Sequence, residues 1–136
     1  MRNRLPEVQG LPTIDQASNI FGNTAGGEGG GVYVEAADLT MSGGELHGNT
    51  AAGYGGGIYV DAANKTVTMT NVKVAENQAG GKGGGAYIWN GTLDGSLAEL
   101  TDNTATGGIV GIGFKKNQAT APLTVPANQQ TKVEDP

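Results

Sequence analysis

Apolar and polar residues alternate along this chain in short runs. In the first clear interval the runs are 32–34, 39–42 and 44–47, and in each of them the apolar residues recur every second position. A period of two with β-branched and aromatic residues is typical of β-strands, and no window has the period of a helix. The pattern therefore predicts an all-β protein built from short strands.

The same pattern repeats along the chain. The segments NTAGGEGGGVYV, NTAAGYGGGIYV and NQAGGKGGGAYI begin at Asn23, Asn49 and Asn77, and a degenerate fourth copy begins at Asn103. They start 26, 28 and 26 residues apart, and the two extra residues of the second interval fall within 61–66, in a predicted loop. Stacking equivalent strands of successive repeats gives parallel sheets around one core. We therefore expect a short right-handed parallel β-helix (β-solenoid) with three strands per coil and about four to five coils.

Alignment of the repeats sorts the side chains into columns. The columns expected to face inward are apolar throughout: Val32, Ile58, Ala86 and Ile112; Val34, Val60, Ile88 and Phe114; Leu39, Val67 and Leu93; Ile20, Leu46, Val74 and Leu100. The columns expected to face outward include Tyr33, Tyr59 and Tyr87; Glu35, Asp61 and Trp89; Glu45, Lys73 and Glu99. Because a slip of one residue would exchange the two sets, the columns support this register.

The flanks of the repeat region contain prolines. A β-helix exposes unpaired strand edges at both ends, and proline cannot donate a hydrogen bond to a neighbouring strand. We therefore expect residues 1–17 to form an N-terminal cap segment, residues 18–117 to form the β-helix repeats, and residues 118–136 to form a C-terminal cap or tail. A chain of 136 residues has room for one such domain.

Composition and charge limit the classes of function that this chain could have. Glycine is enriched, at 25 residues, and falls where the chain must turn between strands. The net charge is −5 without a basic stripe, which argues against nucleic acid as a partner. There is no cysteine, and no apolar run is long enough for membrane insertion. We expect no cofactor and no metal site, and the first ten residues lack the apolar stretch of a signal peptide.

Two sets of residues recur at equivalent positions and are candidates for function or stability. Tyr33, Tyr59 and Tyr87 beside Glu35, Asp61 and Trp89 offer aromatic faces and carboxylates, which could bind glycans or a protein partner. Plain stacking between neighbouring strands explains the same residues, and we give it the greater weight. The second set, Asn23, Asn49, Asn77 and Asn103, falls at one corner, where stacked amides would form a structural asparagine ladder.

The repeats resemble those of bacterial right-handed parallel β-helix proteins, including the polymorphic outer-membrane protein repeats with GGA[ILV] and FxxN motifs. The first motif corresponds to Gly30-Gly31-Val32, Gly56-Gly57-Ile58 and Gly84-Gly85-Ala86. The second corresponds to Ile20 to Asn23, Leu46 to Asn49, Val74 to Asn77, Leu100 to Asn103 and Phe114 to Asn117. The resemblance implies an extracellular or cell-surface location and a role in adhesion, and it implies no chemistry by itself.

Two other functions compete with a non-catalytic surface module. Exposed strand edges could stack end to end, as in a self-assembling structural fibre. Glu35 and Asp61 on adjacent coils would lie near the spacing of a retaining glycosidase pair, as in a carbohydrate-active enzyme. A polysaccharide lyase, by resemblance to enzymes of this fold, would need a basic residue on this sheet, which offers no arginine and only Lys115 at its end. We expect the single histidine, His47, to be a solvated surface residue, and we predict no catalytic residues.

Overall fold

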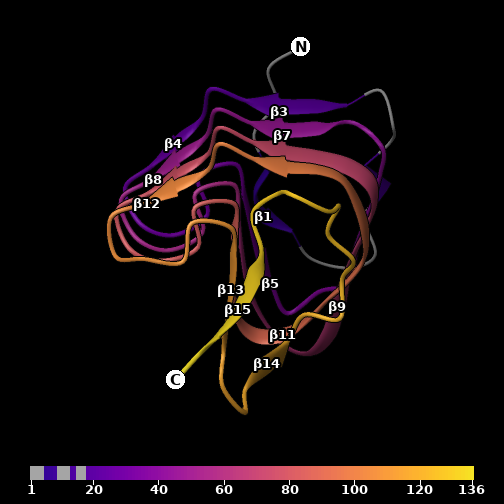
Figure 1. Ribbon diagram of the computed structural model, residues 1–136. Coiled ribbons are helices and arrows are strands. Elements are labelled where there is room, and N and C mark those ends of the chain that lie inside the picture. Colours follow the sequence, from indigo (N-terminus) through magenta and orange to yellow (C-terminus); the bar gives the residue numbers. More distant parts are fainter. Residues whose placement is uncertain (1–4, 9–12, 15–17) are drawn as a thin grey trace.

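The computed structural model describes residues 5–8, 13–14 and 18–136, and every regular element in these ranges is a β-strand. The chain winds in stacked coils whose strands pair in parallel (Figure 1). The strands are β1 (Leu5–Val8), β2 (Thr13–Ile14), β3 (Asn19–Phe21), β4 (Thr24–Ala25), β5 (Val32–Glu35), β6 (Leu39–Ser42), β7 (Glu45–His47), β8 (Thr50–Ala51), β9 (Ile58–Ala75), β10 (Gln78–Ala79), β11 (Ala86–Thr101), β12 (Thr104–Ala105), β13 (Ile112–Lys115), β14 (Ala119–Thr120) and β15 (Lys132–Asp135).

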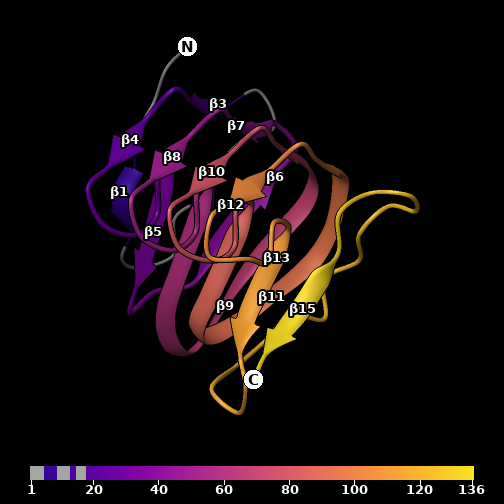
Figure 2. The same ribbon diagram turned by 60° about the vertical axis from the view of Figure 1, so that its left-hand side comes forward.

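Three faces surround the core. The first face runs in the order β1, β5, β9, β11, β13 and β15, whose later strands lie side by side in Figure 2. The second face holds β2, β6, the middle of β9 and of β11, and β14, and the third holds β3, β7 and the ends of β9 and β11. Since β9 and β11 continue around the corners, each covers all three faces. The predicted parallel β-solenoid is confirmed.

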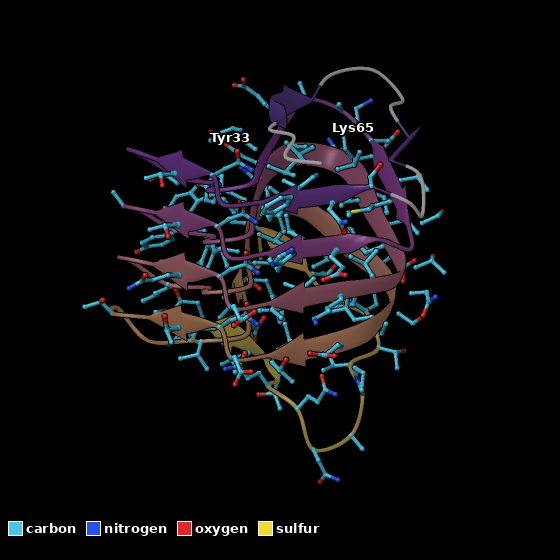
Figure 3. All side chains as sticks on the ribbon, turned by 90° about the horizontal axis from the view of Figure 1, so that it is seen from above. Tyr33 and Lys65 are labelled. Atoms are coloured by element: carbon cyan, nitrogen blue, oxygen red, sulfur yellow. The ribbon has the colours of Figure 1, made fainter. Side chains whose placement is uncertain are left out.

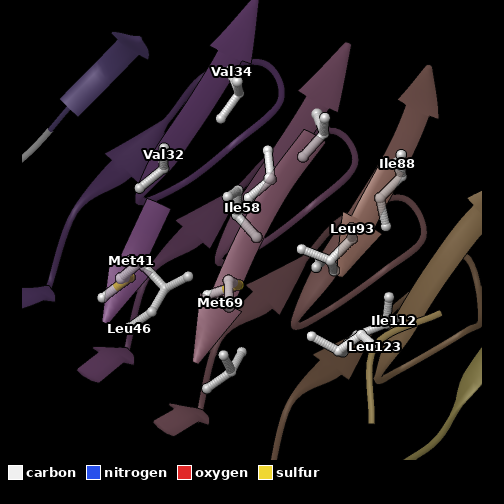
Figure 4. Packing of buried hydrophobic residues seen from close by; sticks show 14 of the residues in the cluster. Val32, Val34, Met41, Leu46, Ile58, Met69, Ile88, Leu93, Ile112 and Leu123 are labelled. Carbon is white, nitrogen blue, oxygen red and sulfur yellow. The ribbon is translucent and has the colours of Figure 1, made fainter. Parts of the chain in front are cut away.

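The predicted register is also confirmed. Val32 pairs with Ile58, Ile58 with Ala86, and Ala86 with Ile112. These residues are at most 2 % exposed and form one column of the core (Figure 4). The columns that begin with Leu39 and Ile20 are buried to the same degree. Because burying a large aliphatic side chain contributes about 1.5 to 3 kcal/mol, these columns are the main stabilising feature of the fold.

Each of the four coils from residue 19 onward carries one strand more than the predicted three. β4, β8, β10 and β12 form a separate parallel sheet, from which the chain returns through a hooked loop to the first face (Figure 1). We call the segments 24–31, 50–57, 78–85 and 104–111 the glycine arm; its strands lie in separate layers in Figure 3. Glycine permits this close stacking, because a Cβ at Gly56 would lie 2.4 Å from the carbonyl oxygen of Gly84.

Both flanks of the repeats continue the parallel pairing. In the N-terminal segment, β1 pairs with β5 and β2 with β6, while residues 1–4, 9–12 and 15–17 lie outside the described residues. At the other end β15 pairs with β13, and Leu123, Ala119 and Ala121 are buried against the core. The C-terminal segment therefore covers the core at the last coil.

Candidate functional site

The tyrosine column, Tyr33, Tyr59 and Tyr87, lies on the first face and points away from the core. The three residues pair across β5, β9 and β11. The ring centroids of Tyr33 and Tyr59 are 5.1 Å apart, and those of Tyr59 and Tyr87 are 6.4 Å apart with nearly parallel planes. The stacking of this column is as predicted.

The expected exposure of the tyrosine column is wrong for two of its members. Tyr59 is 7 % exposed and Tyr87 is 1 % exposed, whereas Tyr33 is half-buried. The cause is the glycine arm, whose hooked loop returns beside the outer surface of the first face. The ring of Tyr54 in the arm packs edge-on against Tyr87, with centroids 4.8 Å apart. Burial raises the pKa of the Tyr59 and Tyr87 hydroxyls well above their usual range.

The tip of the arm carries a second column parallel to the first. Glu28, Tyr54 and Lys82 occupy equivalent positions, and the amides that follow Glu28 and Tyr54 donate to the carbonyls of Tyr54 and Lys82. We call these three residues the tip column. In the fourth coil the equivalent positions of both columns are glycines, Gly108 and Gly113, and the Tyr87 ring lies over Gly113. Because these two glycines have no side chains, there is space for another side chain at this end of the two columns.

Asp135 of β15 occupies this end. Its carboxylate accepts hydrogen bonds of 3.0 Å from Lys82 Nζ and 2.8 Å from the Tyr87 hydroxyl. Partial burial pushes the pKa of this carboxyl upward, but the hydrogen bonds from Lys82 and Tyr87 outweigh that effect and hold the pKa below its usual range. The hydrogen bond to Asp135 raises the pKa of Lys82. Sequence reasoning missed this contact, because nothing in the repeat pattern places residue 135 beside the third coil.

The acidic and aromatic column next to the tyrosines is only partly as predicted. Glu35 and Asp61 pair on adjacent strands, and Glu35 is exposed. Opposite Asp61, however, lies Asn90 rather than Trp89, because the register shifts between Ile88 and Asn90. The amide of Asn90 donates a 2.8 Å hydrogen bond to Asp61. The irregularity therefore inserts an amide into a column that we expected to hold only carboxylates and an indole.

Trp89 lies one strand away from a cation. The Nζ atom of Lys115 is 3.9 Å from the centre of the indole ring, and both side chains are half-buried. Lys115 follows Trp89 by 26 residues, so the repeat spacing alone could have found this neighbour. We call Tyr33, Glu35, Asp61 and Trp89 the outer strip; it combines aromatic rings, two carboxylates and, through Lys115, one cation.

The asparagine ladder is formed as predicted, and it is buried. The Oδ1 atom of Asn77 accepts from the backbone N–H and the side-chain amide of Asn49, both at 3.0 Å. Asn103 receives the same two bonds from Asn77, and Asn49 receives them from Asn23. Beyond the four predicted members, Gln130 accepts from the backbone N–H and the side-chain amide of Asn103, whereas Asn117 of the last FxxN motif is exposed. The ladder satisfies amides inside a bend and offers no surface to a ligand.

His47 is half-buried and stacks on Phe21, with ring centroids 5.2 Å apart. Its Nε2 atom is 3.9 Å from a carboxylate oxygen of Glu45, a neighbour that the column alignment did not pair with it. Lys73 lies between Glu45 and Glu99 at 3.8 and 4.0 Å, so this outward column alternates in charge. Across the described ranges, no three His, Asp or Glu residues gather closely enough to hold a metal ion.

Comparison with known protein families gives a match within the repeat region. The Chlamydia polymorphic membrane protein repeat matches residues 45–61, which run from β7 through the arm of the second coil into β9. The chain is a parallel β-helix repeat protein similar to the polymorphic membrane protein type. No curated protein and no solved structure matches the chain. In the part of the chain that the structure describes, no helix has the length and apolar character needed to cross a membrane.

Proposed function

We propose that this chain is a non-catalytic module displayed at a cell surface, where the outer strip binds glycans during adhesion. The similarity to a membrane protein repeat supports the location. The observation that supports binding is the strip itself, in which Trp89 and Tyr33 flank the carboxylates of Glu35 and Asp61 on consecutive strands. Aromatic faces stack on the apolar faces of sugar rings, and carboxylates accept hydrogen bonds from sugar hydroxyls.

The burial of Tyr59 and Tyr87 changes where a ligand would bind. Both rings are buried, and Tyr87 packs against Tyr54 of the arm, so they are not available for stacking on a ligand. In the described part of the first face, the outward aromatic groups that keep some exposure are Tyr33 on β5 and Trp89 on β11. A glycan would therefore lie across the strands, along the direction in which the coils stack.

The test is binding of the labelled chain to a glycan array. We expect Trp89→Ala and Glu35→Gln each to weaken binding by about tenfold, which corresponds to about 1.4 kcal/mol. Thr40→Ala and Ser96→Ala change exposed residues on the second face and serve as matched controls that leave binding unchanged. Circular dichroism checks that each variant is folded. Absence of binding by the wild type, or equal loss in the controls, would contradict the proposal.

Other functions are less well supported. Asp61 already accepts a hydrogen bond from Asn90, which reduces its freedom to act as a nucleophile in a glycosidase pair with Glu35. Stacking of copies at the last coil would have to displace Leu123 and β15, which cover the core there. A protein partner on the outer strip is the remaining alternative; it predicts no glycan on the array but the same loss for Trp89→Ala in a cell-adhesion assay.

A further inference from the structure

The corner between the first and second faces differs from coil to coil. Glu35 pairs with Asp61 and Leu39 with Val67, so the second coil has two extra residues at this corner, as the repeat spacing predicts. Asn64 lies in this insertion with φ of 62° and is exposed. The corner of the second coil is therefore two residues longer than that of the first coil.

The third coil has the opposite feature at the same corner. Its corner residue is Gly91, with φ of 99°, and a Cβ there would lie 2.5 Å from the carbonyl oxygen of Ala62. At this corner the fourth coil carries Asn117, which has φ of 63° and is exposed. The corner of the third coil, where Gly91 has no side chain, thus lies between two corners that carry the exposed side chains of Asn64 and Asn117.

A pocket of about 340 Å³ lies at this corner. Gly91 and Thr92 of β11 are part of its lining, together with the insertion of the second coil, the turn from β13 to β14, and β15. Apart from Ala119, the side chains that line it are polar: Asn64, Thr92, Asn117, Gln118, Thr120 and Glu134. The hydroxyls of Thr120 and Thr92 are 3.2 Å apart and connect β14 to β11.

The chemistry of the lining selects a class of ligand. Three amides and two hydroxyls can each donate and accept hydrogen bonds, while Glu134 only accepts when ionised. This set suits a neutral ligand with many hydroxyl groups and disfavours an anion or an apolar ligand. The volume lies at the small end of the range of about 300 to 1,000 Å³ for small-molecule sites. A single sugar ring has the matching size and hydrogen-bonding capacity.

The pocket adjoins the outer strip. Trp89 precedes Gly91 by two residues on β11, and Lys115, which lies over the Trp89 ring, precedes Asn117 by two residues. We infer that this pocket is a binding subsite for one neutral sugar unit, and that the next unit of the chain stacks on Trp89. This inference rests on the proposed glycan function and adds a position and a ligand class to it.

The test uses the full chain, with methyl glycosides of glucose, galactose, mannose and N-acetylglucosamine as probes in a two-dimensional amide NMR titration. We expect at least one glycoside to shift the amide signals of Gly91, Thr92 and Ala119.

The double variant Asn64→Gly and Asn117→Gly removes two amides and preserves the positive φ angles, because glycine adopts them without strain. It should weaken binding by at least about tenfold. Asn71→Gly is the matched control, since Asn71 is also exposed with a positive φ of 56° but is not among the residues that line the pocket.

The outcomes separate this inference from the proposed function. If a glycan from the array shifts the Trp89 indole signal but leaves Gly91 and Thr92 unchanged, the subsite is wrong and the surface function stands. If the double variant binds as well as Asn71→Gly, the subsite is also wrong. If neither glycosides nor array glycans bind, both proposals fail. Glu134→Gln should retain binding, because a neutral ligand does not need the charge; its complete loss would contradict a neutral sugar as the ligand.

Discussion

At the residue scale, a central ladder asparagine makes hydrogen bonds to three different residues with one buried side chain. Asn77 is 0 % exposed; its Oδ1 accepts two hydrogen bonds from Asn49, and its amide donates to Asn103 and to the carbonyl oxygen of Leu46. The residues just before the ladder positions, Gly22, Gly48, Glu76 and Asp102, all have φ between 57° and 66°. A residue other than glycine costs about 1 to 2 kcal/mol in this conformation. The ladder bonds offset that cost at Glu76 and Asp102.

Replacing a central ladder residue should therefore destabilise the whole stack. In Asn77→Ala, the backbone and side-chain amides of Asn49 lose their acceptor in a buried site, and we expect a loss of about 3 kcal/mol or more in the free energy of unfolding. Chemical denaturation followed by circular dichroism measures it. Gln78→Ala, at an exposed neighbour, is the control and should change stability by less than about 0.5 kcal/mol. A loss in Asn77→Ala as small as that of the control would contradict the role of the ladder.

At the element scale, β15 is held differently from the inner strands. Among the described residues it pairs on one edge only, with β13, and Lys132, Val133 and Glu134 are exposed. Two of its side chains attach it: Lys132 donates to the carbonyl oxygen of Leu123, and Asp135 joins β15 to Lys82 of the arm and Tyr87 of the first face. The Asp135 carboxylate connects segments from the third coil and the C-terminal end, so we expect its ionisation to affect how firmly β15 is attached.

The attachment of β15 should weaken in acid. The folded protein lowers the pKa of Asp135, so the stabilisation is present above the unfolded pKa of about 4 and is lost as the pH falls below it. Hydrogen exchange of the Lys116 amide, which donates to the carbonyl of Asp135, reports the attachment. After correction for intrinsic exchange rates, we expect several-fold lower protection at pH 3 than at pH 6.

Two comparisons make the pH test specific. The Ile58 amide, which donates to Gly85 in the middle of the stack, should keep its protection at both pH values. Asp135→Asn should show low protection of Lys116 at both, because its amide cannot form the ion pair with Lys82. Equal protection of Lys116 at pH 3 and pH 6 in the wild type would show that Asp135 does not anchor β15.

At the scale of the whole molecule, each coil contacts mainly its neighbours, as in other solenoids. The Asn49 to Glu76 coil can be removed in principle, since Gly48 then precedes Asn77 and each column loses one member without changing its register. We expect the variant without residues 49–76 to fold with the same β-rich spectrum and to lose about 1 to 4 kcal/mol of stability, in proportion to its length. Thermal and chemical unfolding followed by circular dichroism measure this loss.

The control for this variant is a deletion of half a coil. Without residues 49–62, the chain downstream would be displaced by half a turn, so that Gly81 of the arm would take the place of Val67 in its core column. This variant should not unfold cooperatively. A cooperative transition in the half-coil deletion, or its absence in the full-coil deletion, would contradict the modular stacking.

Sequence reasoning succeeded for features that repeat in register. The inward columns, the parallel pairing of Val32 with Ile58 and the ladder from Asn23 to Asn103 follow from one spacing, because equivalent residues of a solenoid must stack. It failed where the chain departs from the repeat. The shift that puts Asn90 opposite Asp61, and the position of Gln130 at the end of the ladder, each depend on a local irregularity that no spacing encodes.

The amino-acid sequence by itself therefore determined the winding, the register and the residues of the core, since these depend on periodic alternation and on hydrophobic burial. Only the tertiary structure decided which of the outward residues are exposed to solvent. Tyr59 and Tyr87 are outward in the strand pattern and yet buried, because the arm returns beside them and brings Tyr54 and Lys82 close, with Asp135 joining from β15. The pattern of a strand specifies the direction of a side chain, whereas its exposure depends on what a distant segment places over it.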